Sequence, residues 1–444
     1  MSTKHLSLPA QGLPKDELFR RMTEQRAGDF NWHDGRTWSL VYHAGDEITA
    51  LIREAYAMFI HENGLGPLAF PSIRRMEAEV VSMSASLLGG DGEVVGNMTS
   101  GGSESILMAV KTARDRARAE RPEVTAPEML LPVTAHPAFD KAAHYFGLTP
   151  VKVPVTAGFR ADLSALRDLI TRNTVLMVGS SPSYPHGVID PIAEMAALAA
   201  ERSIHFHVDA CVGGFLLPFA RRLGHPVPAF DFTVPGVDSI SADLHKYGYA
   251  AKGASVILFR NQQIRRHMFF ATTDWPGGLY GSPTMTGTRP GGAIAAAWAV
   301  LNYLGEEGYL RLARTVLDTT RAIVEGIRAT PGLRVLGEPD MSVLAFASDE
   351  LDVFSLADAL DQRGWHLDRQ QRPNSLHLMV TPAHAGIVEP FLRDLRESTA
   401  LLLGGGPAPE GSAAMYGALT SIPEREIVRD AIIGVMESWT QRSE

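Results

Sequence analysis

Residues 239–248 (SISADLHKYG) place a lysine, Lys246, directly after a short apolar run. His245 and Tyr247 flank this lysine, so we do not expect it to be a solvated charge on the surface. A lysine that is partly desolvated among cationic or apolar neighbours has a lowered pKa, and its amine can then act as a nucleophile or a base. The segment therefore predicts covalent or acid–base chemistry at Lys246, with a lowered pKa.

Another apolar run ends in an aspartate, Asp209. In an α/β protein such a position lies at the carboxyl edge of the sheet, where ligands bind. His205, His207 and Asp209 alternate along the strand and therefore face one side. Three interpretations stay open: a plain core strand, a His-x-His-x-Asp metal site, and a carboxylate that tunes a bound heterocycle. The last is favoured, because Ala210 and Cys211 follow instead of a further histidine.

A glycine pair, Gly101 and Gly102, opens the helical pattern of residues 104–120. Glycines let the backbone approach a ligand closely, and the start of a helix offers free N–H groups and the positive end of its dipole. Ser103 could give its hydroxyl to a phosphate or simply cap the helix. No Walker lysine follows, and the glycines near residue 90 have the wrong spacing for a dinucleotide motif. Nucleotide-binding folds therefore receive little support.

These three features complement one another. Asp209 and Lys246 are separated by about one β-α-β step. An anion cradle, a carboxylate for a pyridine nitrogen and a lysine amine are the groups that pyridoxal 5′-phosphate needs. We therefore expect this cofactor, and no metal, in the site.

The composition limits the class of protein. The chain has 444 residues, of which 45% are hydrophobic and 20% charged, and its formal net charge is -9. This acidic balance, without a long basic run, argues against a nucleic-acid surface. The single cysteine, Cys211, excludes an internal disulfide and a cysteine-clustered zinc site. The N-terminus resembles no signal peptide, and the apolar stretch 291–304 is too short to span a bilayer, so we expect a soluble, cytoplasmic protein.

The middle of the chain alternates short apolar runs with helical patterns. Continuous apolar runs are typical of strands covered on both faces, so we expect an α/β fold with a mostly parallel central sheet. After residue 306 the order of strand, helix and strand predicts a smaller α+β domain. The predicted parts are an N-terminal segment 1–58, a large domain 59–306, a C-terminal domain 307–444, a linker at 404–411 and a last helix at 424–439. The predicted strands of the large domain are 129–133, 174–178, 204–208, 239–242 and 255–259.

Five longer motifs occur in order along the chain. They are residues 99–105 (TSGGSES), 181–191 (SPSYPHGVIDP), 207–211 (HVDAC), 243–253 (DLHKYGYAAKG) and 280–291 (YGSPTMTGTRPG). Together they resemble the sphingosine-1-phosphate lyases, a family of group II decarboxylase-like enzymes, from about residue 40 to the end. The resemblance implies the aspartate aminotransferase-like fold type I, bound pyridoxal phosphate and a homodimer with shared active sites.

The resemblance also implies a role for each matching residue around the cofactor. Lys246 would hold it covalently, and Asp209 would pair with the protonated pyridine nitrogen. His136 would stack on the ring. Without the resemblance, His136 would be interpreted as an ordinary core histidine. The residues expected at the cofactor phosphate are Gly102, Ser103 and His245 from one chain, and Gly287 and Thr288 from the other.

The substrate side matches less completely. The family often has a histidine three positions after an asparagine, where this chain has Gly66. Loss of that imidazole removes a charge-assisted hydrogen bond of about 1.5–3 kcal/mol to a substrate phosphate, which Lys252 or Arg74 would have to replace. The residues at the family's substrate-contacting positions are Tyr42, Asn63, Tyr184 and Lys252, and packing is the alternative for the tyrosines.

The expected reaction is cleavage of the C2–C3 bond of a phosphorylated long-chain base, a small lipid-phosphate substrate, to a fatty aldehyde and phosphoethanolamine. A rival with the same cofactor is an L-amino-acid decarboxylase, which the lyase-like runs 181–187 and 247–253 disfavour. A metal-binding or scaffolding protein is the non-catalytic alternative. The candidates for proton transfer are Lys252, Tyr184 and His245, among which the sequence does not choose.

Overall fold

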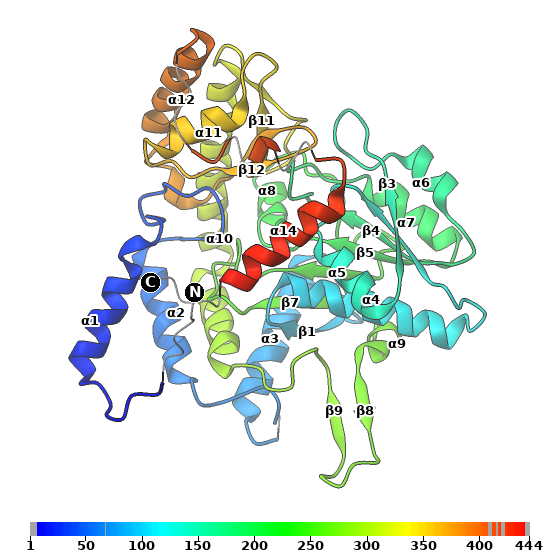
Figure 1. Ribbon diagram of the computed structural model, residues 1–444. Helices are drawn as coiled ribbons and strands as arrows, with labels where there is room; N and C mark the ends of the chain where they lie inside the picture. The colour runs from blue at the N-terminus through cyan, green and yellow to red at the C-terminus, as the bar shows by residue number, and fades with distance from the viewer. Residues whose placement is uncertain (1–6, 67, 407–410, 414–415, 419–421, 440–444) are drawn as a thin grey trace.

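The computed structural model describes residues 7–66, 68–406, 411–413, 416–418 and 422–439. Its centre is a seven-stranded sheet in the order β1-β7-β6-β5-β4-β2-β3 (Figure 1). β7 runs antiparallel to both of its neighbours and the other pairs are parallel, which confirms the mostly parallel sheet. The strands are β1 (Val95–Thr99), β2 (Glu128–Pro132), β3 (Thr149–Val153), β4 (Thr174–Ser180), β5 (His205–Asp209), β6 (Ser239–Ala242) and β7 (Ser255–Phe259).

Helices cover both faces of this sheet, because its central strands are apolar on both sides. Along β4, Leu176 and Val178 join the core beneath α4 and α5, whereas Met177 joins the core on the opposite face. The whole strand is buried, as its continuous apolar run predicts. The helices of this domain are α3 (Pro71–Leu87), α4 (Gly102–Glu120), α5 (Ala138–Phe146), α6 (Leu163–Leu169), α7 (Ile192–Glu201), α8 (Leu217–Arg222) and α9 (Gln262–Arg265).

A long helix, α10 (Gly291–Arg328), joins the two domains. Gly305 interrupts it with φ 54° and ψ -171°, a backbone region open essentially to glycine alone, so the helix kinks there. The part before the kink packs with α2 (Asp46–Met58) on the large core, and the part near Ile327 packs on the small core. The domain boundary predicted between residues 306 and 307 falls beside this kink.

The C-terminal domain is built on a second sheet, β10-β11-β13-β12, in which every pair is antiparallel. Its core includes Trp38 from the N-terminal segment, whose buried ring stacks on His384 with 4.2 Å between centroids. The N-terminal segment therefore packs against this α+β domain through Trp38. The elements are β10 (Arg334–Val335), β11 (Val343–Ala347), α11 (Val353–Asp361), β12 (Asp368–Gln370), β13 (Ser375–Met379) and α12 (Val388–Leu403).

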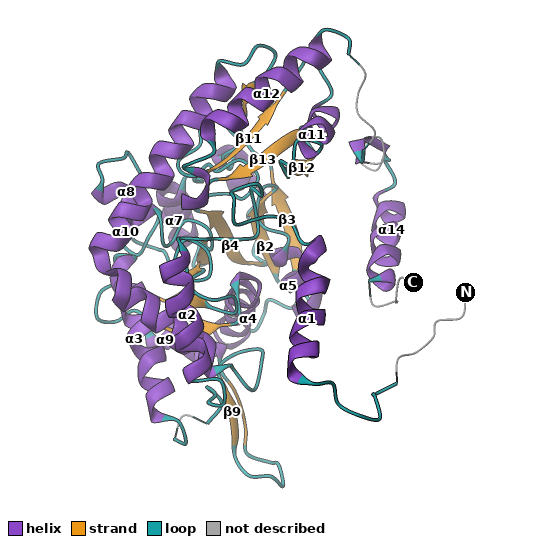
Figure 2. Cartoon of the chain, turned by 90° about the vertical axis from the view of Figure 1, so that its left-hand side faces the viewer, coloured by secondary structure: helices purple, strands orange, loops and turns teal. Residues whose placement is uncertain are grey.

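Two elements stand away from the body of the chain (Figures 1 and 2). One is the hairpin of β8 (Phe270–Thr272) and β9 (Tyr280–Ser282), and the other is α14 (Arg425–Ser438), which confirms the last predicted helix. The N-terminal helix α1 (Lys15–Gln25) has no buried residue. Of the helices in the described ranges, none combines the length and apolarity needed to cross a bilayer. The predicted linker lies partly outside the described residues, at 407–410.

Candidate active site

A cavity of about 340 Å³ opens at the carboxyl ends of β4, β5 and β6, against the first turn of α4. This is the sheet edge at which α/β proteins bind ligands. Residues from four of the five motifs meet there, those at 99–105, 181–191, 207–211 and 243–253. The predicted site residues that line the cavity are Gly102, Ser103, His136, Tyr184, Asp209, His245 and Lys246.

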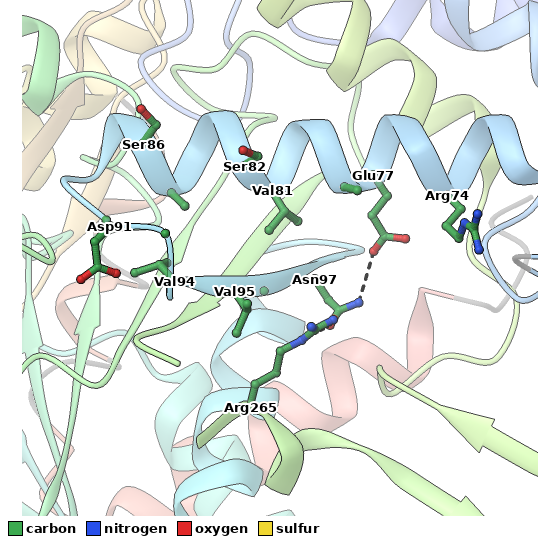
Figure 3. A pocket seen from close by; sticks show the side chains of 15 residues that line it. Arg74, Glu77, Val81, Ser82, Ser86, Asp91, Val94, Val95, Asn97 and Arg265 are labelled. Carbon is green, nitrogen blue, oxygen red and sulfur yellow. Dashed lines mark hydrogen bonds between the residues drawn. The ribbon is translucent and has the colours of Figure 1, made fainter. Parts of the chain in front are cut away.

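A larger cavity, about 580 Å³, lies between α3 and β1 (Figure 3). Figure 3 shows Glu77, Asn97 and Arg265 pointing toward one another in it. Glu77 accepts from the Met98 backbone N–H at 3.0 Å, and Arg265 donates to Asn97 Oδ1 at 2.8 Å. These polar groups already have hydrogen-bond partners within the protein, which leaves them less free to act on a ligand. We therefore assign the chemistry to the cavity that Lys246 lines.

Lys246 is held by a carboxylate that the sequence analysis did not select. Its Nζ lies 3.0 Å from Oδ2 of Asp243, whose side chain is only 2% exposed. Burial is the largest influence on the pKa of Lys246 and would lower it, but Asp243, Cys211 and Asp209 together raise that pKa above its usual value. This direction is the opposite of the lowering that the neighbours along the chain suggest. The signal that could have identified Asp243 is its place three residues before Lys246, one turn away.

Asp209 ends β5 with its carboxylate fixed in direction. Oδ1 accepts hydrogen bonds from the Cys211 backbone N–H at 3.0 Å and from the Ser241 hydroxyl at 3.3 Å. On the same face, His207 bonds to two serine hydroxyls of β6, and burial lowers its pKa to about 3. His205 likewise bonds to Ser239, at 2.7 Å. Of these three residues, Asp209 is the one that lines the cavity, so His205 and His207 do not share a site with it there.

His136 lies in the loop between β2 and α5 and lines the cavity. Its Nδ1 accepts a hydrogen bond from the Ala138 backbone N–H at 3.1 Å, which fixes the plane of the ring. Burial lowers the pKa of His136, so the ring is neutral near pH 7. A neutral, oriented imidazole suits stacking against a flat heterocycle.

The phosphate end of the site is built from backbone. Gly101 has φ 155°, and a Cβ added at Gly102 would lie 2.7 Å from Asp243 Oδ2. Only glycine therefore lets the chain turn this closely into α4, whose first N–H groups face an anion with the positive end of the helix dipole. His245 completes the cradle, and Ala254 N–H donates to its Nδ1 at 3.2 Å.

Tyr184 forms one wall of the cavity, and the C-terminal domain holds it there. The Tyr184 hydroxyl donates to Asp368 Oδ2 at 3.2 Å, and the His377 ring stacks on the phenol with 4.4 Å between centroids. Burial, and then the charge of Asp368, raise the pKa of Tyr184 above its usual value. The phenol therefore stays protonated near neutral pH.

Tyr42 and Lys252 lie together beside the cavity without lining it. Lys252 Nζ donates to the Leu40 carbonyl at 2.7 Å and to the His245 carbonyl at 3.4 Å, and it lies 5.2 Å from the centroid of the Tyr42 ring. Burial, and then the nearby charge of Lys246, lower the pKa of Lys252. The N-terminal segment thus reaches the site through Tyr42.

The remaining predicted residues form a second group, which borders the cavity without lining it. Asn63 forms a bridge with Pro290, and Arg289 donates to the Gly64 carbonyl at 3.0 Å, so the Asn63 loop is tied to the segment that holds Gly287 and Thr288. Thr288 lines a smaller neighbouring cavity together with Ser100, which also lines the Lys246 cavity. Asn63, Gly287 and Thr288 themselves are not among the residues that line the Lys246 cavity.

The fit to pyridoxal phosphate can be judged from these groups. Asp243 Oδ1 is buried without a hydrogen-bond partner, and the glycine cradle, the oriented imidazole and the fixed carboxylate of Asp209 surround one cavity. The fold and this site define a fold-type I enzyme that depends on pyridoxal phosphate.

Comparison with known proteins places the chain more narrowly. Residues 14–348 match the family model of the pyridoxal-dependent decarboxylase conserved domain. The sphingosine-1-phosphate lyases of rice (Oryza sativa) and Arabidopsis thaliana are 47% and 46% identical to the chain, over 98% and 97% of it and over 82% and 80% of their own lengths. The solved lyase of Burkholderia pseudomallei is 39% identical, has a TM-score of 0.91 and covers 99% of this chain and 98% of its own. The chain belongs to the sphingosine-1-phosphate lyase family, within the pyridoxal-dependent decarboxylases.

Proposed function

We propose that this protein is a carbon–carbon lyase that cleaves phosphorylated long-chain bases of the sphingosine 1-phosphate type between C2 and C3. The products are a fatty aldehyde and phosphoethanolamine. The supporting observation is near full-length similarity to sphingosine-1-phosphate lyases in a chain whose Lys246, Asp209 and His136 share one cavity. This similarity favours the lyase over the decarboxylase alternative.

The residues of the cavity position the reacting groups. Bound pyridoxal phosphate supplies an electron sink for the bonding pair that the C2–C3 bond releases. Lys246 would provide the amine that holds the cofactor. Asp209, fixed by Cys211 and Ser241, would hold a proton on the ring nitrogen through its negative charge. The cradle at Gly102 would bind the cofactor phosphate.

The directions of two pKa shifts support different roles for Tyr184 and Lys252 in proton transfer. The C3 hydroxyl must lose a proton as the bond breaks. Tyr184 keeps its proton because its pKa is raised, so it acts as a donor. Lys252 loses a proton more readily because its pKa is lowered, and its Nζ lies beside His245, which lines the cavity. We therefore assign the base to Lys252 and the acid to Tyr184.

We further propose that the enzyme works as a cytoplasmic homodimer with shared sites. Asn63, Gly287 and Thr288 do not line the Lys246 cavity of their own chain, and their family positions imply a contribution to the site of a second chain. The projecting hairpin exposes large apolar side chains, Trp275 and Leu279 among them, that a second copy would cover. The buried free cysteine, Cys211, suits a reducing compartment.

The test of the proposed activity uses the cofactor-loaded protein with sphingosine 1-phosphate. We expect equal amounts of a fatty aldehyde and phosphoethanolamine, measured by mass spectrometry. A panel of L-amino acids run in parallel should release no carbon dioxide. Release of carbon dioxide without aldehyde formation would establish the decarboxylase instead.

Gly66→His is expected to strengthen phosphate recognition. A Cβ at Gly66 would meet only Ala69, at 3.6 Å, so a side chain fits there. The loop is tied to the Thr288 segment and would present the imidazole to the second chain's substrate phosphate. A new charge-assisted hydrogen bond should raise kcat/KM for the phosphorylated substrate about 10–100-fold relative to the unphosphorylated base.

The matched control is Gly66→Ala, which adds the Cβ without the imidazole and should leave the ratio of the two kcat/KM values unchanged. An equal gain with both substrates would show that the histidine acts on the loop and not on the phosphate.

A further inference from the structure

Two histidines and an aspartate meet on the N-terminal segment, outside the cavity of Lys246. His33 lies in the loop after α1, His43 follows Tyr42, and Asp46 begins α2. One donor atom from each lies within 4.8 Å of the other two. Neither the fold nor the proposed reaction uses these side chains.

The arrangement turns donor atoms toward a common point. His43 Nδ1 lies 3.3 Å from the Thr49 hydroxyl, which leaves Nε2 to face Asp46 Oδ1 at 3.6 Å. The His33 ring stands edge-on to the His43 ring, 5.0 Å between centroids, and stacks on Trp32 at 3.9 Å. A hydrogen bond to the far nitrogen of a histidine is the usual way in which proteins orient a metal ligand.

We propose that His33, His43 and Asp46 bind a divalent first-row transition metal such as zinc, with water completing the coordination. Zinc takes imidazole nitrogen and carboxylate oxygen at about 2.0–2.2 Å, which places neighbouring donors about 3.4 Å apart. The His43–Asp46 distance already meets this requirement. His33 and Asp46 are exposed, and Asp46 keeps 88% of its side chain exposed, so both can close on an ion without disturbing the core. Magnesium and calcium prefer oxygen ligands and fit this set poorly.

The location gives the metal a consequence for the active site. The three ligands lie on both sides of Leu40 and Tyr42, the residues that contact Lys252. An ion shared by His33 and Asp46 would fix this stretch between the loop and α2. Bound metal should therefore act on the substrate side of the site and leave cofactor binding unchanged.

The test measures zinc binding to the cofactor-loaded full chain by isothermal titration calorimetry, with magnesium as the comparison ion. We expect one zinc per chain, no magnesium binding, and at least about a tenfold loss of zinc affinity in His33→Ala and in Asp46→Asn. His144→Ala is the matched control, because His144 is exposed and distant in sequence, and it should bind zinc like the parent chain.

Thermal unfolding separates a metal ligand from a residue that only supports the helix. Zinc should raise the Tm of the parent chain and of His144→Ala but not of His33→Ala, and a chelator should abolish the difference. Zinc affinity unchanged in both ligand variants, or equal binding of magnesium, would overturn the proposal.

Discussion

Replacing Lys246 by alanine is expected to reduce turnover by at least about 10⁴-fold and to leave pyridoxal phosphate without a covalent attachment. The cavity holds one lysine among its lining residues, and Lys252, the nearest other amine, is bonded to the Leu40 carbonyl beside it. No group in the lining can therefore take over. Turnover and the visible absorbance of the protein after gel filtration measure the two effects.

Lys246→Arg is the control for folding in this experiment. Arginine keeps a positive charge near Asp243, so the protein should retain its stability, but a guanidinium does not lose its proton and cannot attack the cofactor aldehyde. Lys141→Ala, at an exposed position of α5, should behave like the parent chain. A coloured, active Lys246→Arg protein would contradict the assignment, and a parent chain that never takes up the cofactor would favour the scaffold alternative.

The central strands and the chemistry at their ends could be predicted from the sequence, because both depend on neighbours along the chain. A continuous apolar run identifies β5, and the residue that ends it, Asp209, must reach the sheet edge. Edge strands give no such signal. β3 is mostly exposed and contains Pro150, which an edge strand tolerates, so nothing in its pattern indicates a strand.

The electrostatics of the site could not be predicted in the same way. The lowered pKa expected for Lys246 rests on its chain neighbours, His245 and Tyr247, whereas in the structure the charge closest to its amine is Asp243, three residues earlier in the same turn. The place of Gly287 and Thr288 relative to a site could not be predicted for another reason. Their proposed site belongs to a second chain, and a sequence pattern within one chain does not show how two chains pack.

Asp243 and Lys246 are expected to stabilise the cofactor-free protein as a pair. Their charged atoms are 3.0 Å apart in a buried site, so removing either takes away the nearest opposite charge of the other. Asp243→Asn should lower the free energy of unfolding by about 1–3 kcal/mol near pH 7, a moderate loss because Lys246 keeps 21% of its side chain exposed to water. Urea unfolding of the cofactor-free protein measures it.

A double-mutant cycle isolates the interaction between the two residues. Asp243→Asn combined with Lys246→Ala should cost less than the sum of the two single changes, by a coupling energy of about 0.5–3 kcal/mol. Asp140→Asn is the control, since Asp140 pairs with Lys152 at the surface and should show additivity with Lys246→Ala. Additive losses for Asp243 and Lys246 would show that their contact does not stabilise the fold.

The pH dependence of that coupling follows from the direction of each pKa. Burial would raise the pKa of Asp243, but Lys246, His245 and Ser255 together lower it below its usual value, so the carboxylate contributes above about pH 4 and its contribution is lost as pH falls through the lowered pKa. The pKa of Lys246 is raised, so its contribution is present below about pH 10 and is lost as pH rises through the raised value. The coupling energy should therefore be constant between these limits.

A charged amine cannot attack an aldehyde, so the ion pair of Asp243 and Lys246 must open before Lys246 captures the cofactor. Asp243→Asn should therefore speed that capture near pH 7, while it lowers the stability of the fold.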